Sequence, residues 1–128
     1  MITHMSVLIE FGEAERRMGP GTAILLERIR DLGSIREAAR SLGAGYPNAW
    51  KQIQKLQSAF DTEIVSTATG GSRGGGTALT AFGADLLKSF RRIEADAIRR
   101  ADLELRHLGR RSQKANSQSC PRQVRRPL

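Results

Sequence analysis

Four side chains that can donate hydrogen bonds recur at helical spacing in the first half of this 128-residue chain. Separated by three, one and three residues, they fall on one face of a helix: Asn48, Lys51, Gln52 and Lys55. Amides can bond to adenine edges, and ammonium groups can reach guanine or phosphate, so this face offers what a helix in a DNA major groove requires. Most polar stripes are only solvated helix faces, but this one carries no carboxylate.

Other side chains near this face have more than one interpretation. Arg36 and Arg40 are interpreted either as contacts to flanking phosphate or as solvated side chains. Tyr46 is interpreted either as a contact to phosphate or a thymine methyl group or as a packed side chain. Arg73 enters a minor groove, holds phosphate or is solvated. Trp50, beside the apolar stripe of the same helix, packs in the core or contacts DNA, and core packing is the favoured interpretation. The predicted DNA-binding residues are Ser34, Arg36, Tyr46, Asn48, Lys51, Gln52, Lys55 and Arg73.

The segment before this face is predicted to form a strand and then a helix. Apolar and polar residues alternate over 7–11, which predicts a short strand, and Gly-Pro-Gly at 19–21 then breaks the chain. Thr22 is the predicted N-cap of a helix that Gly33 ends. The apolar residues of this helix recur at i, i+4 and i+7: Leu25, Ile29 and Leu32.

Two further helices are predicted on either side of a glycine-containing turn. Ser34 caps the first, with Glu37 three residues on in a capping box, and the turn occupies 43–45. The next helix runs from about Tyr46 to Phe60, and its first turn tolerates Pro47. The predicted inward residues are Ile35, Ala38, Ala39 and Leu42, then Ala49, Ile53, Leu56 and Phe60. Two short helices about such a turn predict a helix-turn-helix.

A hairpin and a long helix are predicted after residue 60. The β-branched segment 63–69 and the segment 77–79 predict antiparallel strands, joined by a loop with five glycines among residues 70–76, the form of a wing. Thr80 is the predicted cap of a helix that ends at Leu108. Its apolar seam has steps of four and three residues: Leu86, Phe90, Ile93, Ala97, Ala101, Leu105 and Leu108. The helix extends beyond what the small folded part of the chain can cover, so a second copy of the chain is expected to cover this seam.

The net charge of +8 points to acidic partners, but its distribution weakens that argument. Residues 109–128 contain six basic and no acidic residues and are rich in Ser, Gln, Asn and Pro, so they are predicted to be disordered. The remaining body carries only +2. Within it, residues 34–60 carry +3, and the functional prediction rests on how these charges are placed.

Several classes of protein do not fit the composition. No Ser-His-Asp or paired-carboxylate arrangement has suitable spacing, so no enzyme activity is expected. One cysteine, Cys120, with His4 and His107, makes neither an internal disulfide nor a zinc site, and no cofactor or metal is expected. The chain lacks an apolar run that could cross a bilayer and lacks a secretory signal at its start, so a cytoplasmic location away from membranes is expected.

The order of motifs over about residues 5–95 resembles the N-terminal DNA-binding domain of the molybdate-dependent ModE regulators, which belong with the LysR-type winged helix-turn-helix proteins. The residues that carry this resemblance are Gly19-Pro20-Gly21, Leu25-Leu26, Gly33-Ser34-Ile35, Ala38-Ala39, Tyr46, Ala49-Trp50, Thr69-Gly70-Gly71, Gly74-Gly75-Gly76, Leu79-Thr80 and Gly83. The resemblance implies a homodimer on a palindromic operator, with the helix over 46–60 in the major groove and the wing beside it. Gly45 and Pro47 depart from the hydroxyl and basic residues common in that family, which removes one cap and one phosphate contact. Molybdate binding is not expected, because only the basic tail follows Leu108.

Together these patterns predict a mostly α fold with a small β-hairpin. A winged helix-turn-helix over 1–80 is expected to precede a dimerisation helix over 81–108 and a disordered basic tail over 109–128. The predicted function is that of a sequence-specific transcription regulator without a ligand domain of its own, which binds double-stranded DNA as a homodimer on a palindromic operator. The predicted dimer contacts are Leu86, Phe90, Ile93, Ala97, Ala101 and Leu105. The alternative is a protein–protein interaction module that dimerises with or modulates another regulator, since an amphipathic seam does not distinguish a second copy from another partner.

Overall fold

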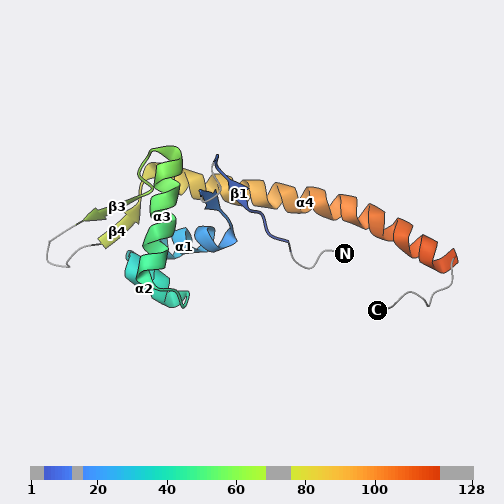
Figure 1. The fold of residues 1–128 in the computed structure, drawn as a ribbon, viewed down its shortest axis with the longest axis horizontal. Coiled ribbons are helices and arrows are strands. Elements are labelled where there is room, and N and C mark those ends of the chain that lie inside the picture. The colour runs from blue at the N-terminus through green and yellow to red at the C-terminus, as the bar shows by residue number, and fades with distance from the viewer. Residues whose placement is uncertain (1–4, 13–15, 69–75, 119–128) are drawn as a thin grey trace. The chain divides into compact units, whose positions relative to one another are not determined.

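The protein is mostly helical, with two small antiparallel pairs of strands. The computed structural model describes residues 5–12, 16–68 and 76–118, with side chains through residue 112. The chain divides into two units, Ser6–Glu94 and Ala95–Leu128 with Met1–Met5. The elements labelled in Figure 1 are β1 (Ile9–Glu10), β2 (Arg17–Met18), α1 (Pro20–Leu32), α2 (Ile35–Ser41), α3 (Tyr46–Phe60), β3 (Val65–Ala68), β4 (Gly76–Leu79) and α4 (Ala81–Gln118).

The first pair of strands confirms the predicted strand near the start and adds a partner that was not predicted. In β1, Ile9 pairs with Met18 of β2 and Glu10 pairs with Arg17. The alternation over 7–11 holds, because Val7, Ile9 and Phe11 pack against the core. Strand β2 has only two residues, too few for any periodicity to be read from the sequence. The pairing places Met18, which is fully buried, in the core.

Helix α1 begins two residues before the predicted cap, so the assignment of Thr22 as N-cap was wrong. Gly19 is the N-cap, and Pro20 occupies the first helical position, where its fixed φ suits the helix and its missing N–H is not needed. Thr22 is instead buried within the first turn. The predicted end at Gly33 is confirmed, because this residue takes the left-handed conformation at φ 71° and its N–H donates to the Ile29 carbonyl at 2.8 Å.

Helices α2 and α3 form the predicted helix-turn-helix. The Ser34 hydroxyl accepts a hydrogen bond from the Glu37 N–H at 3.1 Å, which confirms Ser34 as the cap of α2. Leu42 was predicted to face inward, but it lies beyond the last helical residue and is 36% exposed. Helix α3 spans Tyr46–Phe60 as predicted, with no side-chain cap from Gly45 and with Pro47 in its first turn.

The core of the Ser6–Glu94 unit lies among α1, α2, α3, the hairpin and the first turns of α4. Its largest fully buried side chains are Phe90, Met18, Leu26, Ile29, Ile53, Leu56 and Ile64. On the other side of α1, a bidentate ion pair joins Glu27 to Arg91 of α4, with both contacts at 3.0 Å. Hydrogen bonding to Glu27 is the main cause that raises the pKa of Arg91, so the guanidinium stays charged. Apolar burial and this pair together anchor α4 to α1.

The β3–β4 hairpin is the predicted wing, and it projects beside α3 in Figure 1. Val65 pairs with Leu79, and the register runs outward to Ala68 opposite Gly76. The Thr77 N–H donates to the Gly33 carbonyl at 2.9 Å, which ties the outer part of β4 to the end of α1. The glycine loop over 69–75, with the predicted contact residue Arg73, lies outside the described residues.

Helix α4 begins where it was predicted to begin and ends later. The Thr80 hydroxyl accepts from the Gly83 N–H at 3.0 Å and donates to the Glu63 carbonyl at 2.7 Å, so Thr80 is a cap. The helix continues past the predicted end at Leu108 to Gln118, so the first half of the predicted disordered tail is helical. The polar composition after Leu108 misled the prediction, because Arg, Gln, Lys and Ala are good helix formers even without an apolar face. Residues 119–128 lie outside the described part.

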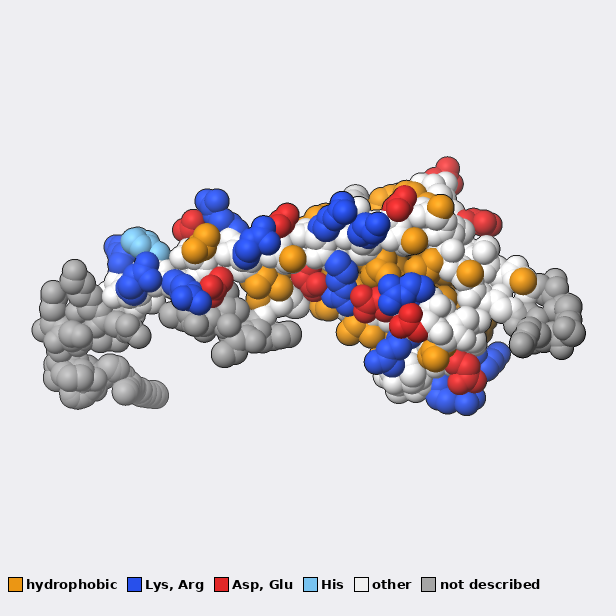
Figure 2. Space-filling model, turned by 180° about the vertical axis from the view of Figure 1, so that it is seen from behind, with side chains coloured by type: hydrophobic (Ala, Val, Ile, Leu, Met, Phe, Trp, Pro, Cys, Tyr) orange, Lys and Arg blue, Asp and Glu red, His pale blue; other side chains and the backbone are white. Residues whose placement is uncertain are grey.

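The predicted dimer seam is only partly exposed. Phe90 is 1% exposed and belongs to the core of its own unit, so its assignment as a dimer contact was wrong, and Leu86 also packs partly against that core. By contrast, Ile93 is 48% exposed. Among the described side chains of the Ala95–Leu128 unit, the exposed leucines are Leu103, Leu105 and Leu108. Figure 2 shows such hydrophobic side chains interrupting the charged ones along α4.

Candidate nucleic-acid interface

Helix α3 separates its apolar and hydrogen-bonding residues onto opposite faces, as predicted. Ala49, Ile53 and Leu56 are buried, each no more than 1% exposed. Asn48, Lys51 and Gln52 are exposed, and Lys55 is half-buried. Because α3 has no acidic residue anywhere between Tyr46 and Phe60, no carboxylate on this helix neutralises the two lysines. The outward face therefore combines positive charge with amide groups.

The N-terminal ends of α2 and α3 come together with the wing around a hollow of about 560 Å³. The Arg36 guanidinium lies over the Tyr46 ring, 4.5 Å from its centroid, which is a cation–π contact that holds both side chains at the rim. The hollow is lined by Gly33, Ser34, Ile35, Arg36, Tyr46, Trp50, Thr67, Ala68, Gly76 and Thr77. The structure thus brings three predicted contact residues, Ser34, Arg36 and Tyr46, to one place.

Two side chains in this region had two interpretations in the sequence. Trp50 is half-buried and packs against the core, as predicted, but it also lines the hollow. Arg40 lies 3.5 Å from the Glu37 carboxylate on the same helix, with both side chains more than half exposed. A surface pair of this kind contributes at most about 1 kcal/mol.

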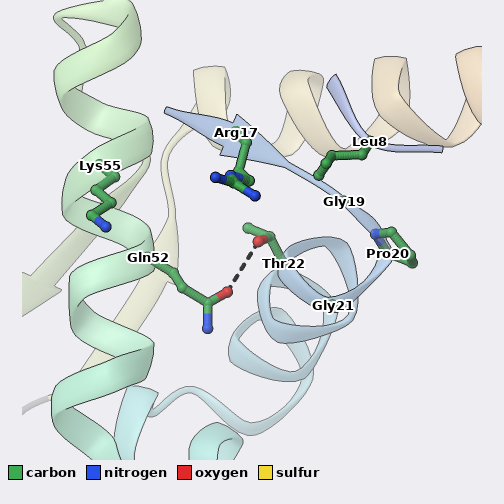
Figure 3. A pocket seen from close by; sticks show the side chains of 8 residues that line it. All are labelled: Leu8, Arg17, Gly19, Pro20, Gly21, Thr22, Gln52 and Lys55. Atoms are coloured by element: carbon green, nitrogen blue, oxygen red, sulfur yellow. Dashed lines mark hydrogen bonds between the residues drawn. The ribbon is translucent and has the colours of Figure 1, made fainter. Parts of the chain in front are cut away.

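A second hollow, of about 510 Å³, lies on the other side of α3 (Figure 3). Gln52 and Lys55 of α3 line it together with Arg17 of β2, Leu8 and the start of α1 at Gly19-Pro20-Gly21-Thr22. The Thr22 hydroxyl donates a hydrogen bond to Oε1 of Gln52 at 3.0 Å. Arg17 was not among the predicted residues, and no spacing pattern could have indicated it, because only the β1–β2 pairing brings it beside α3.

Several carboxylates elsewhere in this unit are paired with arginines. Arg30 bonds to Asp31 at 2.9 Å, and this hydrogen bond lowers the pKa of Asp31 and raises that of Arg30. Arg91 lies within 3.0 Å of both Glu27 and Glu94. These pairs neutralise negative charge on α1 and α4, whereas α3 carries no carboxylate of its own. The arrangement favours an anionic partner at the α3 face.

The described part of the chain shows neither a metal centre nor a membrane span. No three His, Cys, Asp or Glu side chains gather there in a way that could hold a metal ion. No helix among the described residues is long and apolar enough to cross a bilayer.

The sequence matches proteins that regulate transcription. Segments of 71 to 79 residues align with curated relatives at 33–39% identity. The molybdenum-pterin-binding protein MopB of Rhodobacter capsulatus is 39% identical over 62% of this chain and 29% of its own length. The transcriptional regulator ModE of Haemophilus influenzae is 33% identical over 59% of this chain and 29% of its own. The Escherichia coli K12 dual regulator ModE is 35% identical over 56% and 27%. The chain spans less than a third of these relatives, which are DNA-binding regulators or molybdenum-pterin-binding proteins by name.

The fold matches a solved protein–DNA complex. Full-length CbnR in complex with its target DNA superposes with a TM-score of 0.51 and 25% sequence identity, over 66% of this chain and 27% of that one. The model of the bacterial regulatory helix-turn-helix proteins of the lysR family matches residues 23–84, from α1 through the wing to the first turn of α4. Residues 23–84 therefore match the helix-turn-helix domain of the bacterial lysR family, and the similarity to ModE regulators agrees with the resemblance that the motif order indicated.

Proposed function

We propose that this protein is a sequence-specific transcription regulator that reads an operator with the outward face of α3. The observation that carries the proposal is the face itself, on which Asn48, Lys51, Gln52 and Lys55 offer only amide and ammonium groups opposite a buried stripe. In the major groove, amides select bases through their edges, and lysines reach guanine or phosphate. The family match of residues 23–84 supports the same conclusion.

The residues around the first hollow would hold the DNA backbone. Arg36 is kept over Tyr46 by the cation–π contact, so its charge is positioned with little further loss of conformational freedom. Ser34 lines the same hollow between this pair and the wing. Arg73 stays a predicted contact of the wing tip. These groups would set the register of α3 in the groove, because phosphate contacts position a protein and base contacts specify its site.

We further propose that two chains associate through α4 and bind a palindromic operator. The exposed Ile93 starts a series that continues with Ala97, Ala101, Leu105 and Leu108 at helical spacing. Exposed leucines on a long helix lose contact with water when a second copy packs against them. A two-fold dimer presents its two reading helices to half-sites of inverted sequence. The protein would act in the bacterial cytoplasm, where the chromosome lies.

The test removes two charges from α3 and compares the result with an equal loss elsewhere. Lys51→Ala with Lys55→Ala is assayed on fragments of the genome at two salt concentrations, beside Lys88→Ala with Arg92→Ala, two exposed basic residues of α4 that line neither hollow. Both double variants lose the same charge. We expect only the α3 variant to lose sequence-selective binding, whereas non-specific, salt-sensitive binding weakens in both.

Two outcomes would count against this function. Wild-type protein without sequence selectivity at moderate salt would contradict it and would favour the alternative of a protein–protein interaction module. Equal loss of selectivity in the two double variants would show that α3 has no special part in reading DNA.

A further inference from the structure

We propose that Thr22 is a positioning residue that orients Gln52 for base reading, so that Gln52 selects a base with a carbonyl group, guanine or thymine, at one operator position. The proposal rests on the proposed reading of the major groove by α3. Its carrying observation is the hydrogen bond from the Thr22 hydroxyl to Oε1 of Gln52, 3.0 Å long, which joins residues 30 positions apart (Figure 3). The role of Thr22 does not follow from the motif pattern, which indicated a helix cap at this position.

Thr22 is a firm anchor for this bond. It is 9% exposed and is the one buried polar residue among those described in the chain. A buried hydroxyl without a partner is destabilising, so the bond to Gln52 has a strong driving force. The side chain is β-branched and therefore stiff, and it stands in the first turn of α1. The position of its Oγ1 atom is thus restrained by the backbone of α1.

The bond leaves Gln52 with one polar group turned outward. A free glutamine can accept from the adenine amino group through its carbonyl and donate to N7 through its amide. Here the carbonyl oxygen points to Thr22, and Figure 3 shows the amide nitrogen turned away from Thr22. The exposed end of Gln52 is therefore a donor. A donor pairs with O6 or N7 of guanine or with O4 of thymine. Adenine offers only N7, beside an amino group that opposes the donor, and cytosine offers only an amino group.

The bond also reduces what Gln52 loses on binding. An exposed glutamine has three rotatable bonds, and ordering such a side chain at an interface costs conformational entropy. Because Thr22 already restrains Gln52 in the free protein, most of the conformational entropy of this side chain is lost before DNA binds. Removing the Thr22 hydroxyl should therefore weaken the preference at this one base position and leave the phosphate contacts of Lys51 and Lys55 as they are.

The experiment measures base preference by selecting bound sequences from a randomised DNA library with the full chain. The variants are Thr22→Val, which keeps the shape and removes the donor, Thr22→Ser, which restores the hydroxyl, and Gln52→Ala. We expect the wild type to prefer guanine or thymine at one position of each half-site. Gln52→Ala should abolish that preference alone, Thr22→Val should reduce it about fivefold, and Thr22→Ser should retain it.

Two further variants separate orientation from a structural role. Thr22→Val combined with Gln52→Ala should match Gln52→Ala alone, because Thr22 acts through Gln52. Gln52→Glu lies on an exposed position, so it should not disturb folding, and its carboxylate still accepts from Thr22 but offers no donor. The preference should then move to adenine or cytosine. This variant tests the orientation even if Thr22→Val lowers the yield of folded protein.

The outcomes distinguish this proposal from the function on which it rests. A wild type that selects no sequence contradicts the regulator function itself. A selective wild type whose profile Thr22→Val weakens equally at all positions overturns the role of Thr22 and leaves the function standing. A wild-type preference for adenine or cytosine at the position that Gln52→Ala affects would show that Gln52 presents its carbonyl, which also overturns the proposal.

Discussion

Replacement of Gly83 by alanine should destabilise the protein, although alanine is the better helix former. Gly83 lies in the first turn of α4, and a Cβ atom there would overlap the backbone carbonyl of Ile64. That carbonyl already accepts from the Thr80 N–H at 2.9 Å, and the Ile64 N–H donates to Gln57 of α3 at 3.0 Å. The overlapping atom belongs to the backbone, so it cannot move without disturbing both bonds and the start of the wing.

The size of the effect follows from three contributions. Forcing an extra carbon into a packed site costs about 1–3 kcal/mol. Weakening the Thr80–Ile64 hydrogen bond costs about 1 kcal/mol, and the higher helix propensity of alanine returns about 1 kcal/mol. We therefore expect Gly83→Ala to lower the free energy of unfolding by about 1–3 kcal/mol.

Urea or guanidinium unfolding measures this difference, and Gly21→Ala is the matched control. Gly21 also lies in the first turn of a helix, but a Cβ there would meet no atom within 4 Å. The control should gain up to about 1 kcal/mol from the same change of residue. If Gly83→Ala proved as stable as the wild type or more so, the close packing of α4 on Ile64 would be refuted as a constraint on this position.

Two more predictions concern α4 and the rim of the first hollow. Phe90→Ala should lower the free energy of unfolding by about 3–5 kcal/mol because Phe90 is fully buried, whereas Ile93→Ala should change the stability of the monomer little and weaken self-association in sedimentation. Equal effects of the two substitutions on self-association would contradict the division of the seam into core and exposed parts. Arg36→Ala should weaken binding to all DNA sequences and reduce the slope of log affinity against log salt by about 1, measured by titration at several salt concentrations. An unchanged slope would show that Arg36 does not reach phosphate.

Much of the fold was predictable because its signals are local. The spacing of Ala49, Ile53 and Leu56 placed the buried side of α3, and Ser34 before Glu37 marked the start of α2. The failures came where local signals competed. Thr22 and Pro20 both indicate a helix start, and proline prevailed because its φ is already helical. The residues after Leu108 lack an apolar face but are good helix formers, so α4 continues to Gln118.

The candidate site was predictable to the extent that it lies on one helix. Asn48, Lys51, Gln52 and Lys55 share a face through helical periodicity alone, and that regularity holds whatever surrounds the helix. The hollow beside Arg36 and Tyr46 needs α2, α3 and the wing at once. The position of Arg17 next to Gln52 and Lys55 depends on a strand pair that leaves no pattern in the sequence.

The amino-acid sequence by itself therefore determined the helices, the wing, the outward face of α3 and the family resemblance, because each depends on neighbours within a few residues. The tertiary structure alone decided that Phe90 is core rather than interface and that the Thr22 hydroxyl meets Gln52. Both facts depend on which elements pack together. An apolar stripe or a hydroxyl group has the same sequence signature whether its partner lies in the same chain, in another chain or in solvent.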